Sequence, residues 1–180
     1  GMLNAVGLQN PGIDVFCERD IPFLKQYDTK IIVNVCGHST EEYIEVVERL
    51  RDQPVDLLEI NISCPNVVGL TALQDVSFLS EIVDKLLGLI MYYDNYRPIL
   101  LKVSPDLSRA QLDEIIDYCL RSGIDGIVAG NTTRSRDGIT SISAEKIEEI
   151  GNGGLSGAPV HKKNLELVRY VHEKSAGKLP

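Results

Sequence analysis

The sequence lacks the features that mark membrane, secreted and nucleic-acid-binding proteins. It contains no run of about 18 apolar residues, the length from which a membrane-spanning helix is predicted. Positive charge is scarce, because 26 acidic residues outnumber 18 basic ones and give a formal net charge of −8. Nucleic acids and membrane surfaces attract clustered positive charge, so neither is an expected partner. No positively charged and then apolar leader opens the chain, and we therefore expect a cytoplasmic protein.

The cysteines lack the spacing of a metal site. All four are scattered and form no C-x-x-C pair, which zinc sites and cysteine-ligated iron–sulfur clusters usually contain, so we predict no metal. Disulfides belong to oxidising compartments and are not expected here. Cys17, Cys36 and Cys119 are predicted to be buried or partly buried thiols. Cys64 differs, because it stands in "NISCPN" between two asparagines, directly after an apolar run.

What is present is an alternation of short apolar runs with amphipathic segments. Four β-branched runs are predicted as buried strands: KIIVNV from Lys30, VDLLEINI from Val55, RPILLKV from Arg97 and DGIVAGN from Asp125. Strands that alternate with helices over short connections predict parallel βαβ units, here in a single domain over residues 1–180. The pattern fits an open doubly wound sheet and a (β/α)8 barrel equally well. A complete barrel has about 250 residues and eight strands, so a barrel would be only partly present in this chain.

The helical segments carry their own boundary signals. Ser39 with Glu42 is a predicted capping box, Ser108 with Gln111 marks a predicted helix start, and Gly123 is a predicted helix end. Four helices are predicted, and they lie in HSTEEYIEVVERLRD, at about 77–92, from 108 to 121, and in KKNLELVRYVHEK near the C-terminus.

Polar residues stand where each predicted strand ends. Asn34, Asn61 and Lys102 close the first three strands, and Asn131 with Thr132 and Thr133 closes the fourth. The carboxyl ends of parallel strands meet at one face, where ligands bind, so we expect these side chains to lie together. Lysine is rarely buried without a partner. Lys102 inside "ILLKVSPD" therefore predicts an anionic ligand, or the electron-rich ring of a cofactor, as its partner.

A glycine-rich stretch, "GNGGLSGAPV", precedes the last predicted helix. Its backbone N–H groups are candidates for a phosphate cradle. It misses the dinucleotide fingerprint, because Ser156 stands where the third glycine belongs, and it follows a helical rather than a strand pattern. Phosphate cradle and plain loop both remain open interpretations.

Taken together, these motifs resemble a known family. "NISCPN", "LLKVSPDL", "GNTTRSR" and "GGLSGAPV", preceded by "LNAVGLQNPG", are similar in order and spacing to dihydroorotate dehydrogenase, the FMN enzyme of pyrimidine biosynthesis. The resemblance extends from Leu3 to Pro180. It implies a (β/α)8 TIM barrel, of which this chain supplies the central βα units.

The resemblance also implies roles for individual residues. Cys64 matches the catalytic base, which removes a proton from dihydroorotate while a hydride passes to FMN. Lys102 and Asn34 match contacts to the flavin, and Gly157 falls in a loop near it. The amides and the hydroxyl that match substrate contacts are those of Asn4, Asn61, Asn66, Asn131 and Thr132.

The resemblance leaves the class of enzyme divided. A cysteine base is similar to the soluble class, since the membrane-bound, quinone-reducing class uses serine, and we favour the soluble class. "NTTRSRDG" and "LLKVSPDLS" look closer to the membrane class, and "GLQNPG" to the NAD-linked one. Fumarate, NAD and quinone all remain open as electron acceptors. We expect a homodimer, with an electron-transfer partner subunit if the enzyme is NAD-linked.

Two family elements have no counterpart in these residues. One is a lysine that lies upstream of Asn4, and the other is a second glycine-rich segment that lies downstream of Pro180. We therefore expect a longer functional protein and weak FMN binding by the 180 residues alone. Three alternatives stay open. The first is a dihydropyrimidine dehydrogenase-like enzyme, a group that tends to carry histidine where Asn66 stands. The second is a flavin-free, phosphate-binding barrel lyase or isomerase that uses Lys102 to form a Schiff base. The third is a non-catalytic scaffold.

Overall fold

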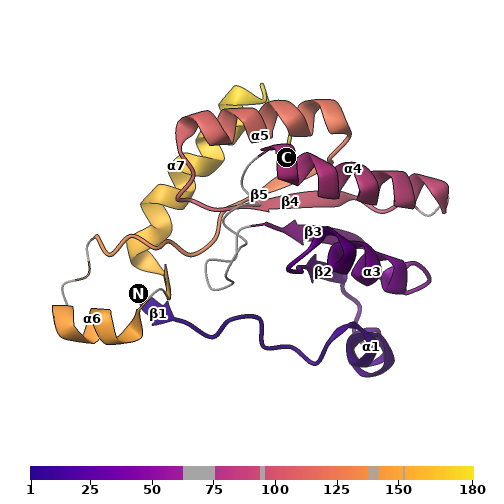
Figure 1. Cartoon of the computed structure of the whole chain (residues 1–180), viewed down its shortest axis with the longest axis horizontal. Helices are drawn as coiled ribbons and strands as arrows, with labels where there is room; N and C mark the ends of the chain where they lie inside the picture. Colours follow the sequence, from indigo (N-terminus) through magenta and orange to yellow (C-terminus); the bar gives the residue numbers. More distant parts are fainter. Residues whose placement is uncertain (63–75, 94–95, 138, 140–141, 152) are drawn as a thin grey trace.

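A parallel four-stranded sheet forms the centre of the chain (Figure 1). The computed structural model describes residues 1–180 except 63–75, 94–95, 138, 140–141 and 152. The strands lie side by side in chain order, and every neighbouring pair is parallel. This arrangement confirms the predicted βαβ units. The strands are β2 (Ile32–Val35), β3 (Leu57–Asn61), β4 (Ile99–Val103) and β5 (Gly126–Ala129).

Helices follow the strands and bury one face of this sheet. Helix α3 packs against α4, α4 against α5, and α5 against α7. Every second side chain of the strands points into the core beneath them, as the period of a strand requires. The helices are α3 (Thr40–Leu50), α4 (Val76–Tyr92), α5 (Arg109–Ser122) and α7 (Ala158–Lys174). The buried apolar side chains of these four strands are Val33, Val35, Leu58, Ile60, Ile99, Leu101, Val103 and Ile127.

The opposite face of the sheet is half open, and we call it the inner face. It is formed by the alternate side chains of the same strands, and its edge residue Ile32 is 56% exposed. In a (β/α)8 barrel this is the face that points toward the barrel axis. The inner face carries both apolar and polar side chains, namely Ile32, Asn34, Leu57, Glu59, Asn61, Leu100, Lys102 and Val128.

The outer edge of β5 is met by the last residues of the chain. The amide of Ile127 donates a hydrogen bond of 3.0 Å to the carbonyl of Pro180. The amide of Leu58 on β3 makes the same 3.0 Å bond to Pro98, which directly precedes β4. The amino end of β5 thus makes the same backbone hydrogen bond on its outer edge as β3 makes to the residue before β4. Such a bond is expected where a sheet continues around a barrel.

The helix boundaries confirm most of the capping signals. Ser108 and Gln111 form a complete capping box, and Gly123 ends α5 with a φ of 88°, a left-handed conformation that favours glycine. The box predicted at α3 is only half formed. Ser39 accepts from the amide of Glu42, but the Glu42 carboxylate bonds the amide of His38 at 2.6 Å instead of the amide of Ser39. The His38 ring also lies 3.2 Å from that carboxylate, so His38 offers it two partners.

A second, smaller sheet was not predicted. Strands β1 (Met2–Asn4) and β6 (Gly154–Ser156) pair antiparallel, so part of "GNGGLSGAPV" is a strand and not a loop. Helix α7 begins at Ala158, four residues before the predicted KKNLELVRYVHEK segment. In the described part of the chain, no helix has the length and apolarity to cross a membrane. The remaining short elements are α1 (Ile13–Val15), the π-helical turn η1 (Phe16–Asp20), α2 (Ile21–Leu24) and α6 (Ala144–Ile150).

Candidate functional site

Four polar side chains meet on the inner face, and we call them the inner-face cluster: Asn34, Glu59, Asn61 and Lys102. The parallel register places Asn34 opposite Glu59 and Asn61 opposite Lys102. The Glu59 carboxylate accepts from the Lys102 ammonium at 3.0 Å and from the Asn34 amide. The Asn61 amide in turn donates to the Asn34 side-chain oxygen at 3.2 Å. Three strands thus contribute to one hydrogen-bonded group.

The structure brings together three residues that the sequence placed at strand ends, namely Asn34, Asn61 and Lys102. Lys102 pairs with Glu59, a partner that was not predicted, and its expected contact with an anionic ligand or a cofactor ring stays a prediction. The two side chains are 22% and 15% exposed, so each needs a partner to offset lost hydration. Glu59 was not predicted as a site residue, because the whole segment VDLLEINI was interpreted as one buried, apolar strand. A signal was present, since Glu59 alternates with Asn61 and shares its face.

The end of β3 is anchored from the helix layer. Asn61 is buried, and its carbonyl accepts a 2.7 Å hydrogen bond from the buried hydroxyl of Tyr43 on α3. The predicted base Cys64 and the predicted substrate contact Asn66 follow directly, but both lie outside the described residues. Tyr43 therefore fixes the point from which the chain enters the segment that carries them.

A second group of predicted residues meets at Gly154. Strand pairing places Asn4 opposite Gly154, and the Asn4 amide lies 3.5 Å from the Gly154 carbonyl. A Cβ at Gly154 would lie 2.1 Å from the hydroxyl of Thr132, so only glycine allows this approach. The Thr132 amide donates to the Asn131 side chain at 2.8 Å. We call Asn4, Asn131, Thr132 and Gly154 the glycine-edge cluster.

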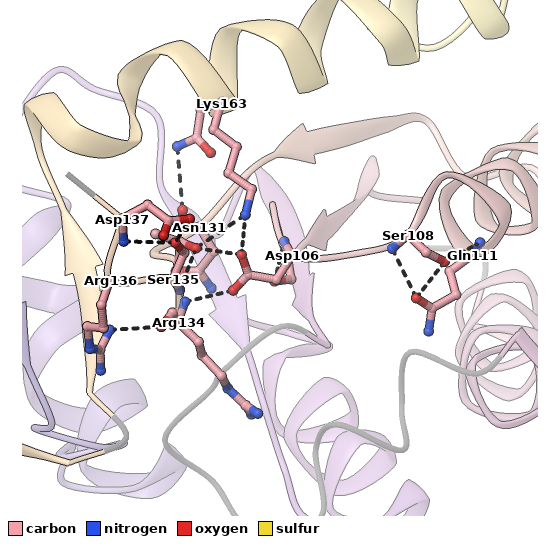
Figure 2. Close-up of polar contacts among 12 residues, drawn as sticks. Asp106, Ser108, Gln111, Asn131, Arg134, Ser135, Arg136, Asp137 and Lys163 are labelled. Atoms are coloured by element: carbon pink, nitrogen blue, oxygen red, sulfur yellow. Dashed lines mark hydrogen bonds and ion pairs between the residues drawn. The ribbon is translucent and has the colours of Figure 1, made fainter. Parts of the chain in front are cut away.

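The backbone around the glycine-edge cluster is held by a carboxylate that sequence analysis missed (Figure 2). Asp106, in the loop between β4 and α5, accepts from the Arg134 amide at 2.7 Å and from the Thr133 hydroxyl and the Lys163 ammonium. Burial raises the pKa of Asp106, but these hydrogen bonds outweigh it and hold the pKa below its ordinary value. The carboxylate is therefore ionised at neutral pH.

Arg136 holds the other side of the same segment. Its guanidinium donates to the carbonyls of Gly151 at 2.8 Å and of Gly153 at 2.6 Å, both of which precede β6. A third bond of 3.1 Å reaches the Arg134 carbonyl. A cationic side chain that bonds three carbonyls fixes the loop after β5 against the strand that carries Gly154.

Gly157 occupies the N-cap of α7 with a φ of 84°. A Cβ there would lie 3.3 Å from the Cα of Gly1, so the start of the chain packs against it. Pro159 in the first turn of α7 removes one of the free amides that a phosphate cradle would use. The role of Gly157 as a cofactor contact stays a prediction.

The three described cysteines are reduced thiols, as predicted. Cys17 and Cys119 are buried, and Cys36 is half-buried. Burial raises the pKa of Cys119 to about 12 and also raises the pKa of Cys17. Neither of these two thiols is therefore suited to accept a proton at neutral pH.

A cavity of about 430 Å³ opens beside β2. Residues 7–13 form one wall, and Ile32, Asn34 and Cys36 belong to the other. Its volume lies within the range of about 300–1,000 Å³ that small-molecule sites occupy. Apolar side chains and one amide from the inner-face cluster thus border a space large enough for a small molecule.

Comparison with known proteins identifies similar chains. The family profile described as dihydroorotate dehydrogenase matches residues 1–180. The chain is 43% identical over 184 residues to the dihydroorotate dehydrogenase B (NAD(+)) catalytic subunit of Lachnoclostridium phytofermentans, covering 100% of this chain and 57% of that protein. It is 34% identical over 183 residues to a putative dihydroorotate dehydrogenase A (fumarate) of Aquifex aeolicus, again with 100% and 57% coverage. The chain thus spans little more than half the length of the curated relatives it matches.

The fold is that of solved barrel enzymes. The crystal structure of DHODH from Eimeria tenella in complex with ferulenol superposes with a TM-score of 0.81 at 24% identity, over 98% of this chain and 54% of that one. The ligand-free form superposes equally well, with a TM-score of 0.81 at 23% identity. The four parallel strands and their helices are therefore part of a (β/α)8 TIM barrel, as the sequence predicted.

Proposed function

Because the chain belongs to the dihydroorotate dehydrogenase family, we propose that a protein carrying it oxidises dihydroorotate to orotate in pyrimidine biosynthesis. The observation that carries this proposal is the inner-face cluster. Asn34, Asn61 and Lys102 were assigned to flavin and substrate by their motifs alone, and they are hydrogen-bonded neighbours around Glu59.

The residues present fit an FMN ring. A flat tricyclic ring needs apolar surface and a few polar contacts at its edge. The inner face offers Ile32 with Leu57 and Leu100 as partly exposed apolar side chains beside the amide of Asn34 and the ammonium of Lys102. FMN, when bound, would supply the redox chemistry by accepting a hydride from the substrate.

The asparagines of both clusters fit a cyclic, anionic substrate that is rich in amide groups. An asparagine side chain both donates and accepts hydrogen bonds, as the ring N–H and C=O groups of such a substrate require. We assign Asn4, Asn61, Asn66, Asn131 and Thr132 to this task. Fixing the substrate in a reactive orientation is worth several kcal/mol, about 7–11 in well-oriented systems.

Cys64 is the proposed base that removes the proton from C5 of the substrate. A thiol with a pKa near its ordinary value of about 8.5 accepts a proton once ionised, so turnover rises with pH. The buried Cys119 is a poor candidate, because burial raises its pKa to about 12.

The proposed enzyme is NAD-linked, and its electron acceptor is a partner subunit. The protein that contains this chain is proposed to form a homodimer. Several of the similar proteins are named catalytic subunits of dihydroorotate dehydrogenase B (NAD(+)), among them those of Lachnoclostridium and Alkaliphilus. The lyase alternative is disfavoured by Glu59. A Schiff-base lysine sits in apolar surroundings or beside another cation, whereas Lys102 lies 3.0 Å from a carboxylate.

The proposal is tested on the full-length protein under anaerobic conditions. Its flavin absorbance is recorded, dihydroorotate is added, and we expect the absorbance to bleach. Cys64→Ser should slow bleaching and shift its pH dependence, while Cys119→Ser should leave both unchanged. Equal effects from the two substitutions would refute the role of Cys64, and a full-length protein without flavin would refute the proposed function.

A further inference from the structure

One carboxylate joins two successive βα units beside the proposed substrate residues. Asp106 belongs to the loop after β4, Thr133 and Arg134 follow β5, and Lys163 lies in the second turn of α7. Figure 2 shows Lys163 and Arg134 converging on the Asp106 side chain. Its side chain is 28% exposed and that of Lys163 is 42% exposed, so the pair is partly shielded from water.

The carboxylate uses both oxygens. One oxygen accepts from the Thr133 hydroxyl and the Lys163 ammonium, and the other accepts from the Arg134 amide at 2.7 Å. The Lys163 ammonium also lies 3.3 Å from the Thr133 hydroxyl, which closes the triangle. A neutral amide in place of the carboxylate has one acceptor oxygen and cannot satisfy both sides.

The segment that Asp106 holds carries Asn131 and Thr132. Thr133 is buried, and its amide and carbonyl pair with Leu155 of β6 at 3.0 and 2.8 Å. The backbone after Thr132 is therefore held by β6 on one side and by Asp106 on the other. The next residue of α7, Asn164, adds its side-chain amide, 3.4 Å from the Asn131 carbonyl.

We propose that Asp106 and Lys163 are positioning residues that set the orientation of Asn131 and Thr132 toward the substrate ring. Neither residue contacts substrate; both act through the backbone of residues 131–134. This inference rests on the proposed function, because it concerns how the same site binds dihydroorotate and orotate.

The test uses the flavin-loaded full-length protein and orotate as the probe. Orotate is titrated in, the change in flavin absorbance gives its Kd, and steady-state assays give KM and kcat for dihydroorotate. Asp106→Asn should raise the Kd and the KM by about tenfold, the equivalent of one strong hydrogen bond, and change kcat less. Asp106→Glu should recover part of the loss, which a general loss of stability would not predict.

Two matched controls separate this role from a change of charge. Asp137→Asn removes a carboxylate from the same loop. Among the described contacts, the Asp137 carboxylate accepts only from the Ser135 hydroxyl, at 2.6 Å, so this substitution should leave the Kd unchanged. Lys163→Met should raise the Kd, whereas Lys162→Met on the same helix, where the side chain is 90% exposed, should not.

Each outcome decides one claim. Wild-type protein that binds no orotate and is not reduced by dihydroorotate would refute the proposed function. Wild-type protein that binds orotate, with an unchanged Kd in Asp106→Asn or an equal rise in Asp137→Asn, would overturn the positioning role alone. If Asp106→Asn does not fold, the comparison of Lys163→Met with Lys162→Met decides, and equal Kd values would overturn the role.

Discussion

Removing the charge of Glu59 should destabilise the inner-face cluster by a measurable amount. Glu59→Gln keeps the shape of the side chain and one acceptor oxygen but leaves the Lys102 ammonium without its counter-ion. A hydrogen bond to a charged group contributes about 1.5–3 kcal/mol, against about 0.5–1.5 for a neutral one. Glu59 accepts from Lys102 and Asn34, so the difference predicts a loss of about 1–3 kcal/mol in the free energy of unfolding.

Solvent screening reduces this figure only in part. The side chains of Glu59 and Lys102 are 15% and 22% exposed, whereas the helix-surface pair Glu81–Lys85 is 49% and 48% exposed at a similar distance of 2.8 Å. Exposed pairs of this kind contribute about 0.3–0.5 kcal/mol. Glu81→Gln is therefore the matched control, and it should leave the free energy of unfolding nearly unchanged.

The assay is a double-mutant cycle on the flavin-free full-length protein. Urea unfolding followed by circular dichroism gives the free energy for wild type, Glu59→Gln, Lys102→Met and the double variant. We expect a coupling energy of about 1–2 kcal/mol, because the second substitution removes a partner that the first has already lost. Additive effects within about 0.5 kcal/mol would show that the two side chains do not stabilise each other and would refute the reasoning.

Two further substitutions, one of them with a matched control, test the scaffold. Arg97 donates hydrogen bonds of 2.6–2.7 Å to the carbonyls of Leu50, Arg51 and Gln53. Arg97→Met should therefore lower the free energy of unfolding, measured by urea titration, by about 2–4 kcal/mol. It should leave the KM for dihydroorotate unchanged. A raised KM would place Arg97 in the site. Gly154→Ala should displace Thr132 and weaken orotate binding in a flavin titration, since an added Cβ would lie 2.1 Å from the threonine hydroxyl. Gly88→Ala on α4, where the added Cβ meets nothing within 4 Å, should instead stabilise the protein by about 0.5–1 kcal/mol and leave orotate affinity unchanged. Equal orotate affinity in both glycine variants would contradict the close packing at Gly154.

The parallel sheet was predictable because its signals are local. Each strand is a short β-branched run, each helix has a periodic apolar stripe, and Ser108 and Gly123 mark the two ends of α5 within the sequence itself. The shared location of Asn34, Asn61 and Lys102 followed from a rule on parallel strands and needed no contact information. The pattern did not distinguish an open sheet from a barrel, because both repeat the same βα unit.

The parts that escaped prediction depend on pairs that lie far apart in the sequence. Met2 pairs with Ser156 across the small sheet, and strands of three residues carry no periodic signal. The bond from Lys163 to Asp106 spans 57 positions, and either residue alone resembles an ordinary surface charge. Glu59 was missed for a different reason, because the surrounding apolar residues led to a prediction of a buried strand and the single carboxylate within it was not considered separately.

Strand β4 connects the two clusters of the proposed site. Lys102, which is assigned to flavin, lies on the inner face of β4. Asp106, four residues later in the loop, holds the segment whose Asn131 and Thr132 are assigned to substrate. Hydride transfer requires the reacting atoms to lie about 3–3.5 Å apart, so the relative placement of cofactor and substrate has to be fixed closely. A strand buried between two neighbours and anchored at both positions is a rigid element for that purpose. In the proposed function, β4 therefore sets the register between the two reactants.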